Sequence, residues 1–317
     1  MNILLFGKDG QLGQEFIHEF GLKDKVTHLL NITSVGRQEC DLSDAEQIRT
    51  LIQTVQPELI INAAAYTAVD QAETQSELAH LINAIAPTIM AEEAQRLGSV
   101  LVHYSTDYVF DGLKKGPYLE TDACRPQSVY GATKLLGEDG IRKNCSKHLI
   151  FRTSWVFSAH GNNFLKTILK LAKTKSELKV INDQCGAPTS TSFIAQATMT
   201  IIEILQTKNI FNGKLAMDSS NDHWGIFNLV ASGFTSWHGY ARYLIEKAVE
   251  EGMGTEFALN PENILSIPSK DYPQTAKRPL NSVLSMNKLG QSYGVVPPNW
   301  ESLVDAELSK MQLNEIN

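Results

Sequence analysis

The stretch NILLFGKDGQLG, residues 2–13, decides the fold of this 317-residue chain. Its apolar run Ile3-Leu4-Leu5-Phe6 predicts a short buried strand, and the segment after it has the apolar spacing of a helix. Between the two stand glycines at G-x-x-G-x-x-G spacing: Gly7, Gly10 and Gly13. Glycine allows a sharp turn and a close approach of backbone N–H groups to an anion, and a helix N-terminus adds partial positive charge. The stretch therefore predicts a dinucleotide-binding turn, although the commoner spacing is G-x-G-x-x-G.

Further short apolar runs follow the first one, and amphipathic segments separate them. We expect strands at residues 26–30, 59–61, 100–104 and 148–151. Continuous apolar strands that alternate with helices are typical of a parallel sheet covered on both faces. The sequence therefore predicts an α/β fold with a doubly wound parallel sheet of the Rossmann type, whose ligands lie beyond the carboxyl ends of the strands.

The pattern loosens after about residue 155, and the last part of the chain is rich in proline. We expect residues 1–155 to form a dinucleotide-binding domain, completed by a returning segment near 178–232. Residues 156–177 and 233–317 are expected to form a smaller C-terminal substrate-binding domain. The length supports this division, because single apolar cores stop growing at about 250–300 residues.

Composition excludes several classes of protein. Apolar residues make up 43% of the chain, charged residues 20%, and the formal net charge is −7. This mixture is that of a globular protein, and it gives no general attraction to nucleic acid or to an anionic membrane surface. No secretion signal is recognisable, and no apolar stretch reaches the ~20 residues that cross a bilayer. The cysteines lie far apart without CxxC spacing, so we expect reduced thiols and a cytoplasmic protein.

Tyr130 and Lys134 form a Y-x-x-x-K pair, which places both on one face of a helix. A lysine ammonium beside a phenol lowers the phenol pKa from its ordinary value of about 10, which makes tyrosine a usable acid near neutral pH. The fourth expected strand leads into Ser105 and Thr106, and the hydroxyl of one or the other can orient a carbonyl toward the phenol. Together with the glycine turn, these residues predict an oxidoreductase that couples proton transfer to hydride transfer from a nicotinamide cofactor.

These motifs resemble the extended short-chain dehydrogenase/reductase superfamily, and longer stretches resemble its dTDP-4-dehydrorhamnose reductase family. The resemblance runs over nearly the whole chain, so it is more specific than the motifs by themselves. It implies reduction of the 4-keto group of dTDP-4-dehydro-L-rhamnose to dTDP-L-rhamnose with NADPH or NADH. The similar stretches are residues 2–8, 10–13, 103–110, 151–155, 180–184, 186–189, 278–279 and 281–282.

The resemblance also implies roles for individual residues. Tyr130 matches the general acid, and Lys134 matches the residue that binds the nicotinamide ribose and tunes the tyrosine. Thr106 and Asp107 match a substrate-contacting pair, in which Thr106 adjusts the proton transfer, and Trp155 matches an aromatic wall of the sugar pocket. The implied cofactor contacts are Gly10, Gln11, Leu12, Asp41, Leu42, Ala65, Tyr66 and Thr67.

Arg278 is a further candidate for substrate binding. A guanidinium group presents a planar fork of donors that suits phosphate oxygens. We therefore place Arg278 near the substrate diphosphate.

The choice between NADH and NADPH depends on Asn31, which stands near the end of the second expected strand. The usual fingerprint has an acid there that holds the adenosine ribose. Asparagine does not repel a 2′-phosphate and can still hydrogen-bond the ribose, and Ser34 and Arg37 follow closely. We therefore expect both cofactors to be accepted, with a modest preference for NADPH.

Some relatives in the resembled family bridge two subunits through a divalent metal held by carboxylates. Glu15 would suit that role, but Ser192 and Asn287 stand where the other acids align. We therefore expect no metal ion, and the sequence is compatible with a homodimer.

Two other functions remain open. An epimerase or dehydratase acting on nucleotide sugars would share the superfamily motifs, although a dehydratase typically has an Asp-Glu pair after the threonine and Thr106-Asp107-Tyr108 lacks the glutamate. The regulatory subunit of methionine adenosyltransferase also resembles this family and acts by binding a partner. The motifs are compatible with that non-catalytic role as well.

Overall fold

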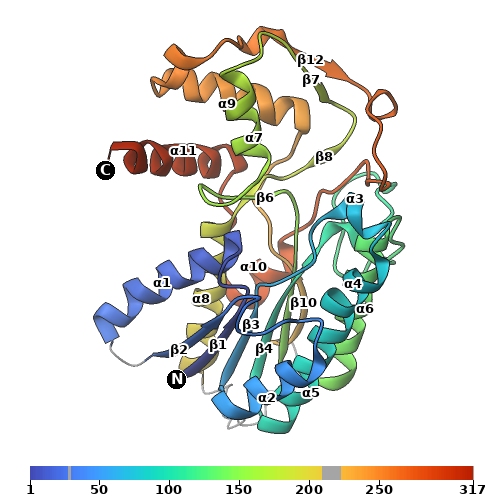
Figure 1. Ribbon diagram of the computed structural model, residues 1–317, viewed down its shortest axis with the longest axis vertical. Helices are drawn as coiled ribbons and strands as arrows, with labels where there is room; N and C mark the ends of the chain where they lie inside the picture. The colour runs from blue at the N-terminus through green and yellow to red at the C-terminus, as the bar shows by residue number, and fades with distance from the viewer. Residues whose placement is uncertain (28–29, 209–222, 317) are drawn as a thin grey trace.

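A six-stranded sheet forms the centre of the computed structural model, which describes residues 1–27, 30–208 and 223–316. The strand order is β10-β5-β4-β3-β1-β2, and all neighbours are parallel (Figure 1). This confirms the predicted doubly wound α/β fold. Chain order reverses beside β1, where open sheets of this type form a ligand-binding crevice. The strand bounds are β1 Asn2–Phe6, β2 Asn31–Val35, β3 Leu59–Asn62, β4 Val100–Thr106, β5 His148–Thr153 and β10 Gly225–Asn228.

Alternate residues of the strands enter two apolar clusters, one on each face of the sheet. In β1, Ile3 and Leu5 join one cluster and Leu4 and Phe6 the other, because successive strand side chains point to opposite faces. Helices α1 and α8 contribute to the first cluster, and α2, α5 and α6 contribute to the second (Figure 1). Their bounds are α1 Gln11–Thr27, α8 Thr191–Thr207, α2 Ala45–Val55, α5 Ala86–Leu97 and α6 Val129–Asn144.

The second strand differs from the prediction. We expected it at 26–30, but α1 continues through Thr27, and β2 begins at Asn31. Residues 28 and 29 of the expected strand lie outside the described residues. Parallel pairing aligns Asn31 with Asn2, the first residue of β1, so the amino ends of the two strands lie together. The prediction was wrong because pairing with β1 selects the mixed polar and apolar stretch Asn31–Val35 and not the more apolar run before it.

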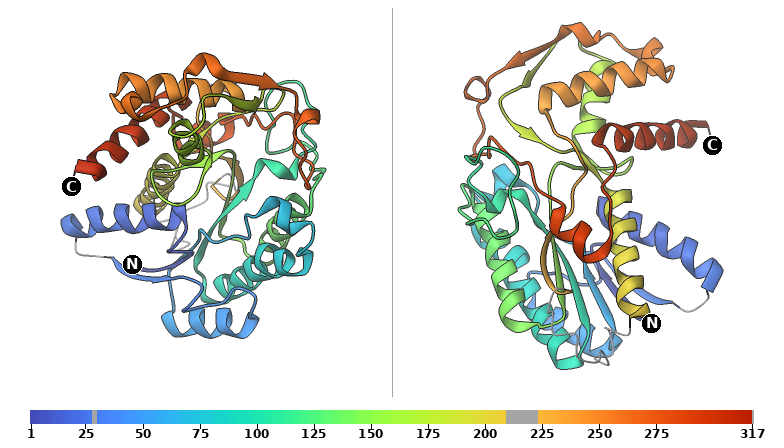
Figure 2. Two further views of the ribbon diagram at one scale, coloured as in Figure 1. Left: turned by 45° about the horizontal axis from the view of Figure 1, so that its top comes forward. Right: turned by 180° about the vertical axis from the view of Figure 1, so that it is seen from behind.

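A smaller part of the chain lies beyond the carboxyl ends of the central strands (Figures 1 and 2). It contains α7, α9 and α11 and the strand pair β7–β12. We expected the segment 178–232 to return to the central sheet, but only part of it does. β7 pairs with β12 outside the central sheet, whereas β10 is a strand of that sheet and α8 packs on one of its faces. The bounds are α7 Phe164–Ala172, α9 Trp237–Glu250, α11 Trp300–Ile316, β7 Leu178–Ile181 and β12 Ile264–Ile267.

The remaining elements are short. Those beside the sheet are α3 Val69–Ala72, α4 Ser76–His80, η1 Leu81–Ile85, η2 Asp107–Val109 and α10 Asn287–Tyr293. The others are β6 Val156–Phe157, β8 Cys185–Gly186, β9 Thr189–Ser190, β11 Thr235–Ser236, η3 Met253–Glu256, η4 Pro261–Asn263 and η5 Ser269–Asp271.

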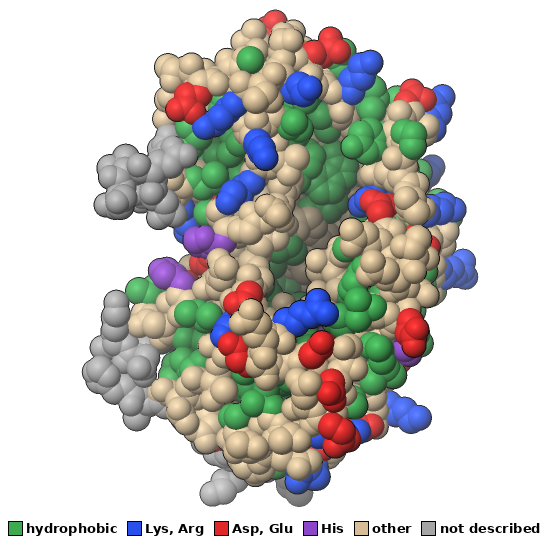
Figure 3. Space-filling model, in the orientation of Figure 1, with side chains coloured by type: hydrophobic (Ala, Val, Ile, Leu, Met, Phe, Trp, Pro, Cys, Tyr) green, Lys and Arg blue, Asp and Glu red, His purple; other side chains and the backbone are tan. Residues whose placement is uncertain are grey.

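The space-filling view shows a hollow between the two parts of the molecule (Figure 3). The central strands end toward this hollow, so it is where the fold places a ligand. In the portion of the chain that is described, none of the helices combines the length and the apolar character needed to cross a lipid bilayer.

Candidate active site

The glycine turn lies between the end of β1 and the start of α1. Gly7 has a φ of +89°, and a Cβ added there would lie 2.7 Å from the backbone nitrogen of Ala64. A Cβ on Gly13 would lie 2.0 Å from the carbonyl oxygen of Gly7. Side chains are therefore excluded at both positions, which keeps the turn tight against the following strand. The first N–H groups of α1, beginning at Gln11, have no partner within the helix and are available to an anion.

A cavity of about 290 Å³ begins at this turn and follows the carboxyl ends of β1, β2 and β3. Gly7, Gly36 and Cys40 line it near the turn. Five residues that the resemblance assigned to the cofactor line it as well: Asp41, Leu42, Ala65, Tyr66 and Thr67. The turn and this cavity together fit the pyrophosphate and adenosine of a dinucleotide.

Asn31 is not part of this cavity, so its assignment to the cofactor was wrong. It begins β2, and its side-chain amide donates a hydrogen bond of 3.1 Å to Asn2 Oδ1 at the amino end of β1. The glycine turn lies at the opposite end of these strands. Arg37 instead follows the carboxyl end of β2, lines the cavity and lies 3.9 Å from Asp41. Ser34 lies inside β2 and does not line the cavity.

Tyr130 and Thr106 come together beyond the end of β4. Tyr130 lies in the first turn of α6, which Ser128 caps by accepting a hydrogen bond from the N–H of Gly131. Burial raises the pKa of Tyr130 above its ordinary value, and a side-chain contact with Thr106 opposes this shift. The hydroxyl of Thr106 donates a 3.0 Å hydrogen bond to Asp107 Oδ1. The arrangement brings the phenol of Tyr130 and the hydroxyl of Thr106 close together.

Asp107 is a buried carboxyl group at the same point. Burial raises its pKa to about 6, and hydrogen bonds from Ser282 and Thr106 oppose the shift. Ser282 belongs to the loop between η5 and α10, so this contact joins the end of β4 to a distant part of the chain. The pair Thr106-Asp107 therefore faces both the phenol and the smaller part of the molecule.

Lys134 lies one turn after Tyr130 on α6 and is fully buried. Its Nζ donates a 2.6 Å hydrogen bond to the carbonyl of Tyr104 and lies 3.1 Å from His103 Nε2. Burial lowers the pKa of Lys134 to about 8. We expected Lys134 to lower the phenol pKa, but the pKa of Tyr130 is raised, because burial dominates and β4 holds the ammonium group.

Trp155 lies two residues beyond β5, whose last residue Thr153 is paired with Thr106. It has a φ of +49°, a conformation that is rare and strained for a large side chain. Its indole stacks on Trp237 at 3.6 Å between ring centroids, and a Cβ on Gly186 would lie 2.5 Å from it. The backbone strain and the stacked indole support an aromatic wall at this position.

Arg278 reaches the same region from the loop after η5. It donates a 2.6 Å hydrogen bond to Asp70 and a 3.3 Å hydrogen bond to the hydroxyl of Tyr108. The ring of Tyr108 packs edge-on against Tyr130 with centroids 5.4 Å apart. The Nε atom of Arg278 is buried and has no hydrogen-bond partner among the described residues. Arg278 is thus linked to Tyr130 through Tyr108, and it has one buried donor that is unpaired among the described residues.

The structure adds residues that sequence reasoning missed. His103 contacts both Asn62 and Lys134, Ser282 contacts Asp107, and Trp237 stacks on Trp155. A histidine inside the apolar run of 100–104 was the available signal for His103. The others come from distant segments, and no spacing connects them to the motifs.

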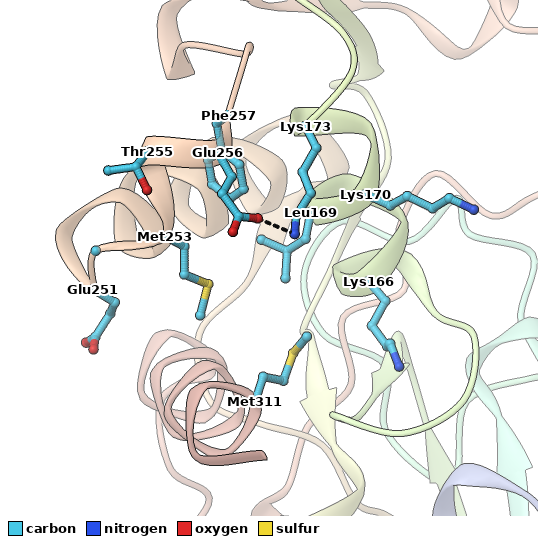
Figure 4. A pocket seen from close by; sticks show the side chains of 11 residues that line it. Lys166, Leu169, Lys170, Lys173, Glu251, Met253, Thr255, Glu256, Phe257 and Met311 are labelled. Carbon is cyan, nitrogen blue, oxygen red and sulfur yellow. Dashed lines mark hydrogen bonds and ion pairs between the residues drawn. The ribbon is translucent and has the colours of Figure 1, made fainter. Parts of the chain in front are cut away.

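A second cavity, of about 610 Å³, lies away from these residues (Figure 4). It is formed by α7, η3 and α11, and the ion pair Lys173–Glu256 of 2.5 Å crosses its edge. Among the residues that the structure describes, none of those predicted for the active site lines it.

Glu15, considered above for a bridging metal, lies on α1 beside His18 and Glu19. One possible ligand atom from each of these residues lies within 4.8 Å of the others. The ammonium of Lys310 lies 3.5 Å from Glu15 and 3.0 Å from Glu307. Ser192 donates a 2.5 Å hydrogen bond to Glu307. A cation of the chain itself thus already lies beside these carboxylates.

Comparisons with known proteins show similarity over the whole length of the chain. The family model of the RmlD substrate binding domain matches residues 1–313. A dTDP-4-dehydrorhamnose reductase of Escherichia coli K12 is 43% identical over 317 residues, which cover 100% of this chain and 98% of the relative. A crystal structure of such a reductase from Clostridium acetobutylicum has a TM-score of 0.84 and 33% identity, covering 98% and 100% of the two chains. Another, from Bacillus anthracis in complex with NADP, has a TM-score of 0.81 and 28% identity, covering 98% and 99%.

Proposed function

Because this chain belongs to the RmlD substrate binding domain family, we propose that it reduces the 4-keto group of dTDP-4-dehydro-L-rhamnose to dTDP-L-rhamnose with NADPH or NADH. The family model and the Escherichia coli reductase cover essentially the whole chain, including the part beyond the sheet. The observation that carries the proposal is the meeting of Tyr130 and Thr106 at the end of β4, beside a turn and cavity that fit a dinucleotide.

Different residues of the chain are proposed to bind the cofactor and to transfer the proton. The N–H groups after Gly10 hold the pyrophosphate, and the cavity beside Asp41 holds the adenosine. The bound dinucleotide supplies the hydride. Tyr130 donates its phenolic proton to the ketone oxygen as that oxygen becomes an alkoxide, and Thr106 holds the phenol and the substrate oxygen in place.

Substrate is proposed to occupy the hollow between the sheet and the smaller part of the chain. Trp155 forms one wall beside the sugar, and Arg278 approaches the diphosphate from the other side. The division into a dinucleotide-binding and a substrate-binding domain follows from this placement. The four cysteines are free thiols, which supports our proposal that the protein works in the cytoplasm.

The direct test mixes the purified protein with NADPH and dTDP-4-dehydro-L-rhamnose. We expect loss of the reduced-cofactor absorbance and a sugar product that is two hydrogens heavier. Cofactor binding without oxidation would contradict a reductase and favour the non-catalytic role. A product of unchanged mass would favour an epimerase, and loss of water from a different nucleotide sugar would favour a dehydratase.

Cofactor preference is predicted to depend on Arg37. Arg37→Ala removes the cation that lines the cavity beside Asp41, where a 2′-phosphate would lie. We expect kcat/KM for NADPH to fall by about tenfold, the effect of one charge-assisted hydrogen bond, with NADH little changed. Asn31→Asp is the matched control, because Asn31 lies at the other end of β2, and it should leave the ratio unchanged. Equal losses with both cofactors would remove Arg37 from this role.

The sugar pocket is predicted to depend on Trp155. Trp155→Ala deletes the indole that stacks on Trp237. Substrate binding should weaken by on the order of 1 kcal/mol or more, the value of an aromatic contact, while cofactor affinity stays the same. Calorimetric titration of each ligand separates the two effects. A change in cofactor affinity only would place Trp155 outside the sugar pocket.

A further inference from the structure

His103 lies between Asn62 and Lys134 in the interior of the active site. Its Nδ1 is 3.1 Å from the amide nitrogen of Asn62, and its Nε2 is 3.1 Å from the ammonium nitrogen of Lys134. Each of the three side chains is 1% exposed. Buried polar groups require matched donors and acceptors, so the positions of the protons in this row can be worked out.

Asn62 fixes the direction of the hydrogen bonds in this row of side chains. The backbone N–H of Ala64 donates a 3.2 Å hydrogen bond to Asn62 Oδ1, which directs the amide NH₂ group toward His103. That NH₂ group is a donor, so Nδ1 of His103 must accept and carries no proton. Burial holds the pKa of His103 well below its ordinary value, so the ring is neutral. Its single proton therefore lies on Nε2.

The Nε2–H group of His103 then points at Lys134. A hydrogen bond between them requires a lone pair on Nζ, which an amine has and an ammonium lacks. The amine can still donate to the carbonyl of Tyr104. Moving the imidazole proton to Nδ1 would place it against the NH₂ group of Asn62, and rotating that amide would break its contact with Ala64. The row is thus fully paired only when Lys134 is neutral.

We propose that His103 is a positioning residue that stabilises the amine form of Lys134, and that Asn62 sets the imidazole tautomer required for this. The inference rests on the proposed function, in which Tyr130 is the proton donor. When an Nζ–H bond of the Lys134 ammonium breaks and its proton passes to solvent, the new lone pair on Nζ accepts the Nε2–H group of His103.

The surroundings of Lys134 are compatible with an amine. Burial favours the amine, because it lowers the pKa of Lys134 to about 8. Glu138, one turn further along α6, raises that pKa, but Arg152 forms an ion pair of 2.6 Å with it.

The first test reads the tautomer directly. Protein labelled with ¹⁵N-histidine is measured by NMR, and His103→Gln identifies the resonances of His103. We expect a neutral ring protonated on Nε2 in the unaltered protein. A ring protonated on Nδ1, or a charged ring near neutral pH, would overturn the proposal. The measurement needs no substrate, so its outcome is independent of whether the protein is a reductase.

The second test reverses the tautomer. Asn62→Asp places a carboxylate oxygen against Nδ1, which should move the ring proton there and leave Nε2 as an acceptor for the ammonium. The pKa of Lys134, followed by NMR of ¹³C-labelled lysine, should rise by about one unit, the worth of one hydrogen bond. The apparent pKa of the alkaline limb of the kcat–pH profile should rise by the same amount.

A control distinguishes the effect of the His103 tautomer on the pKa of Lys134 from the direct effect of the new carboxylate charge. Asn62→Asp is combined with His103→Phe, which keeps an aromatic ring but has no nitrogen. In the parent, Asn62→Asp should raise the pKa of Lys134 by the amount given above. When the same substitution is made in His103→Phe, the rise in the pKa of Lys134 should be clearly smaller. Equal rises in both backgrounds would mean that the carboxylate acts through its charge, and the proposal would be wrong. A failure of NADPH oxidation with the expected NMR result would count against the proposed function only.

Discussion

Tyr130→Phe is expected to lower kcat by roughly two orders of magnitude or more, the usual contribution of a positioned general acid. The substitution removes the hydroxyl that meets Thr106 and keeps the ring that packs against Tyr108. Since the ring contact survives, the fold and the dinucleotide cavity should remain intact. Single-turnover oxidation of NADPH in the presence of substrate measures the chemical step.

Cofactor affinity provides the control for this variant. NADPH should bind Tyr130→Phe about as tightly as the parent, because the glycine turn and the cavity beside Asp41 lie on other elements. Tyr108→Phe is the matched variant, since it removes a neighbouring phenolic hydroxyl that contacts Arg278 and not Thr106. Near-normal turnover of Tyr130→Phe would exclude Tyr130 as the proton donor.

Glu138→Leu is expected to destabilise the protein by about 3–5 kcal/mol, because it leaves the Arg152 guanidinium buried without its counter-charge. Both partners are 2% exposed or less, and their closest atoms are 2.6 Å apart. The pair ties α6, which carries Tyr130 and Lys134, to β5. We expect Tm to fall by on the order of 10 °C in a thermal melt.

The double variant Glu138→Leu with Arg152→Met provides the comparison. It removes both charges together, so most of the lost stability should return. The remaining polar neighbours of Arg152, the carbonyl of Glu120 and the thiol of Cys124, lose only hydrogen bonds. If Glu138→Leu melted at the temperature of the parent, the buried charge would have to be solvated in a way that this structure does not provide.

Local sequence was sufficient for the elements whose signals are contiguous. The apolar run before Gly7 and the glycines after it predicted β1, α1 and the tight turn between them, because these signals lie in adjacent residues. The Tyr130–Lys134 spacing likewise placed both on α6. The prediction of the second strand failed for the converse reason. Residues on either side of Asn31 could form a strand, and only pairing with β1 decides which of them do.

The residues around Lys134 show where local signals end. The helix places Lys134 one turn after Tyr130, but the direction of its ammonium group is decided by the carbonyl of Tyr104 and by His103 on β4. The sign of the Tyr130 pKa shift followed from the same fact. Burial, a property of the assembled core, outweighed the neighbouring charge that the spacing had suggested.

The sequence by itself determined the α/β class, most of the central strands, the glycine turn and the Tyr-Lys pair, since each depends on residues close together along the chain. The tertiary structure decided which distant groups meet them. Arg278 donates a hydrogen bond to Asp70 on α3, more than two hundred residues away in the chain, and Ser282 donates one to Asp107. Asn62 on β3 fixes the ring of His103 on β4. These contacts depend on the register of neighbouring strands and on loop closure across the hollow, and neither leaves a periodic signal in the sequence.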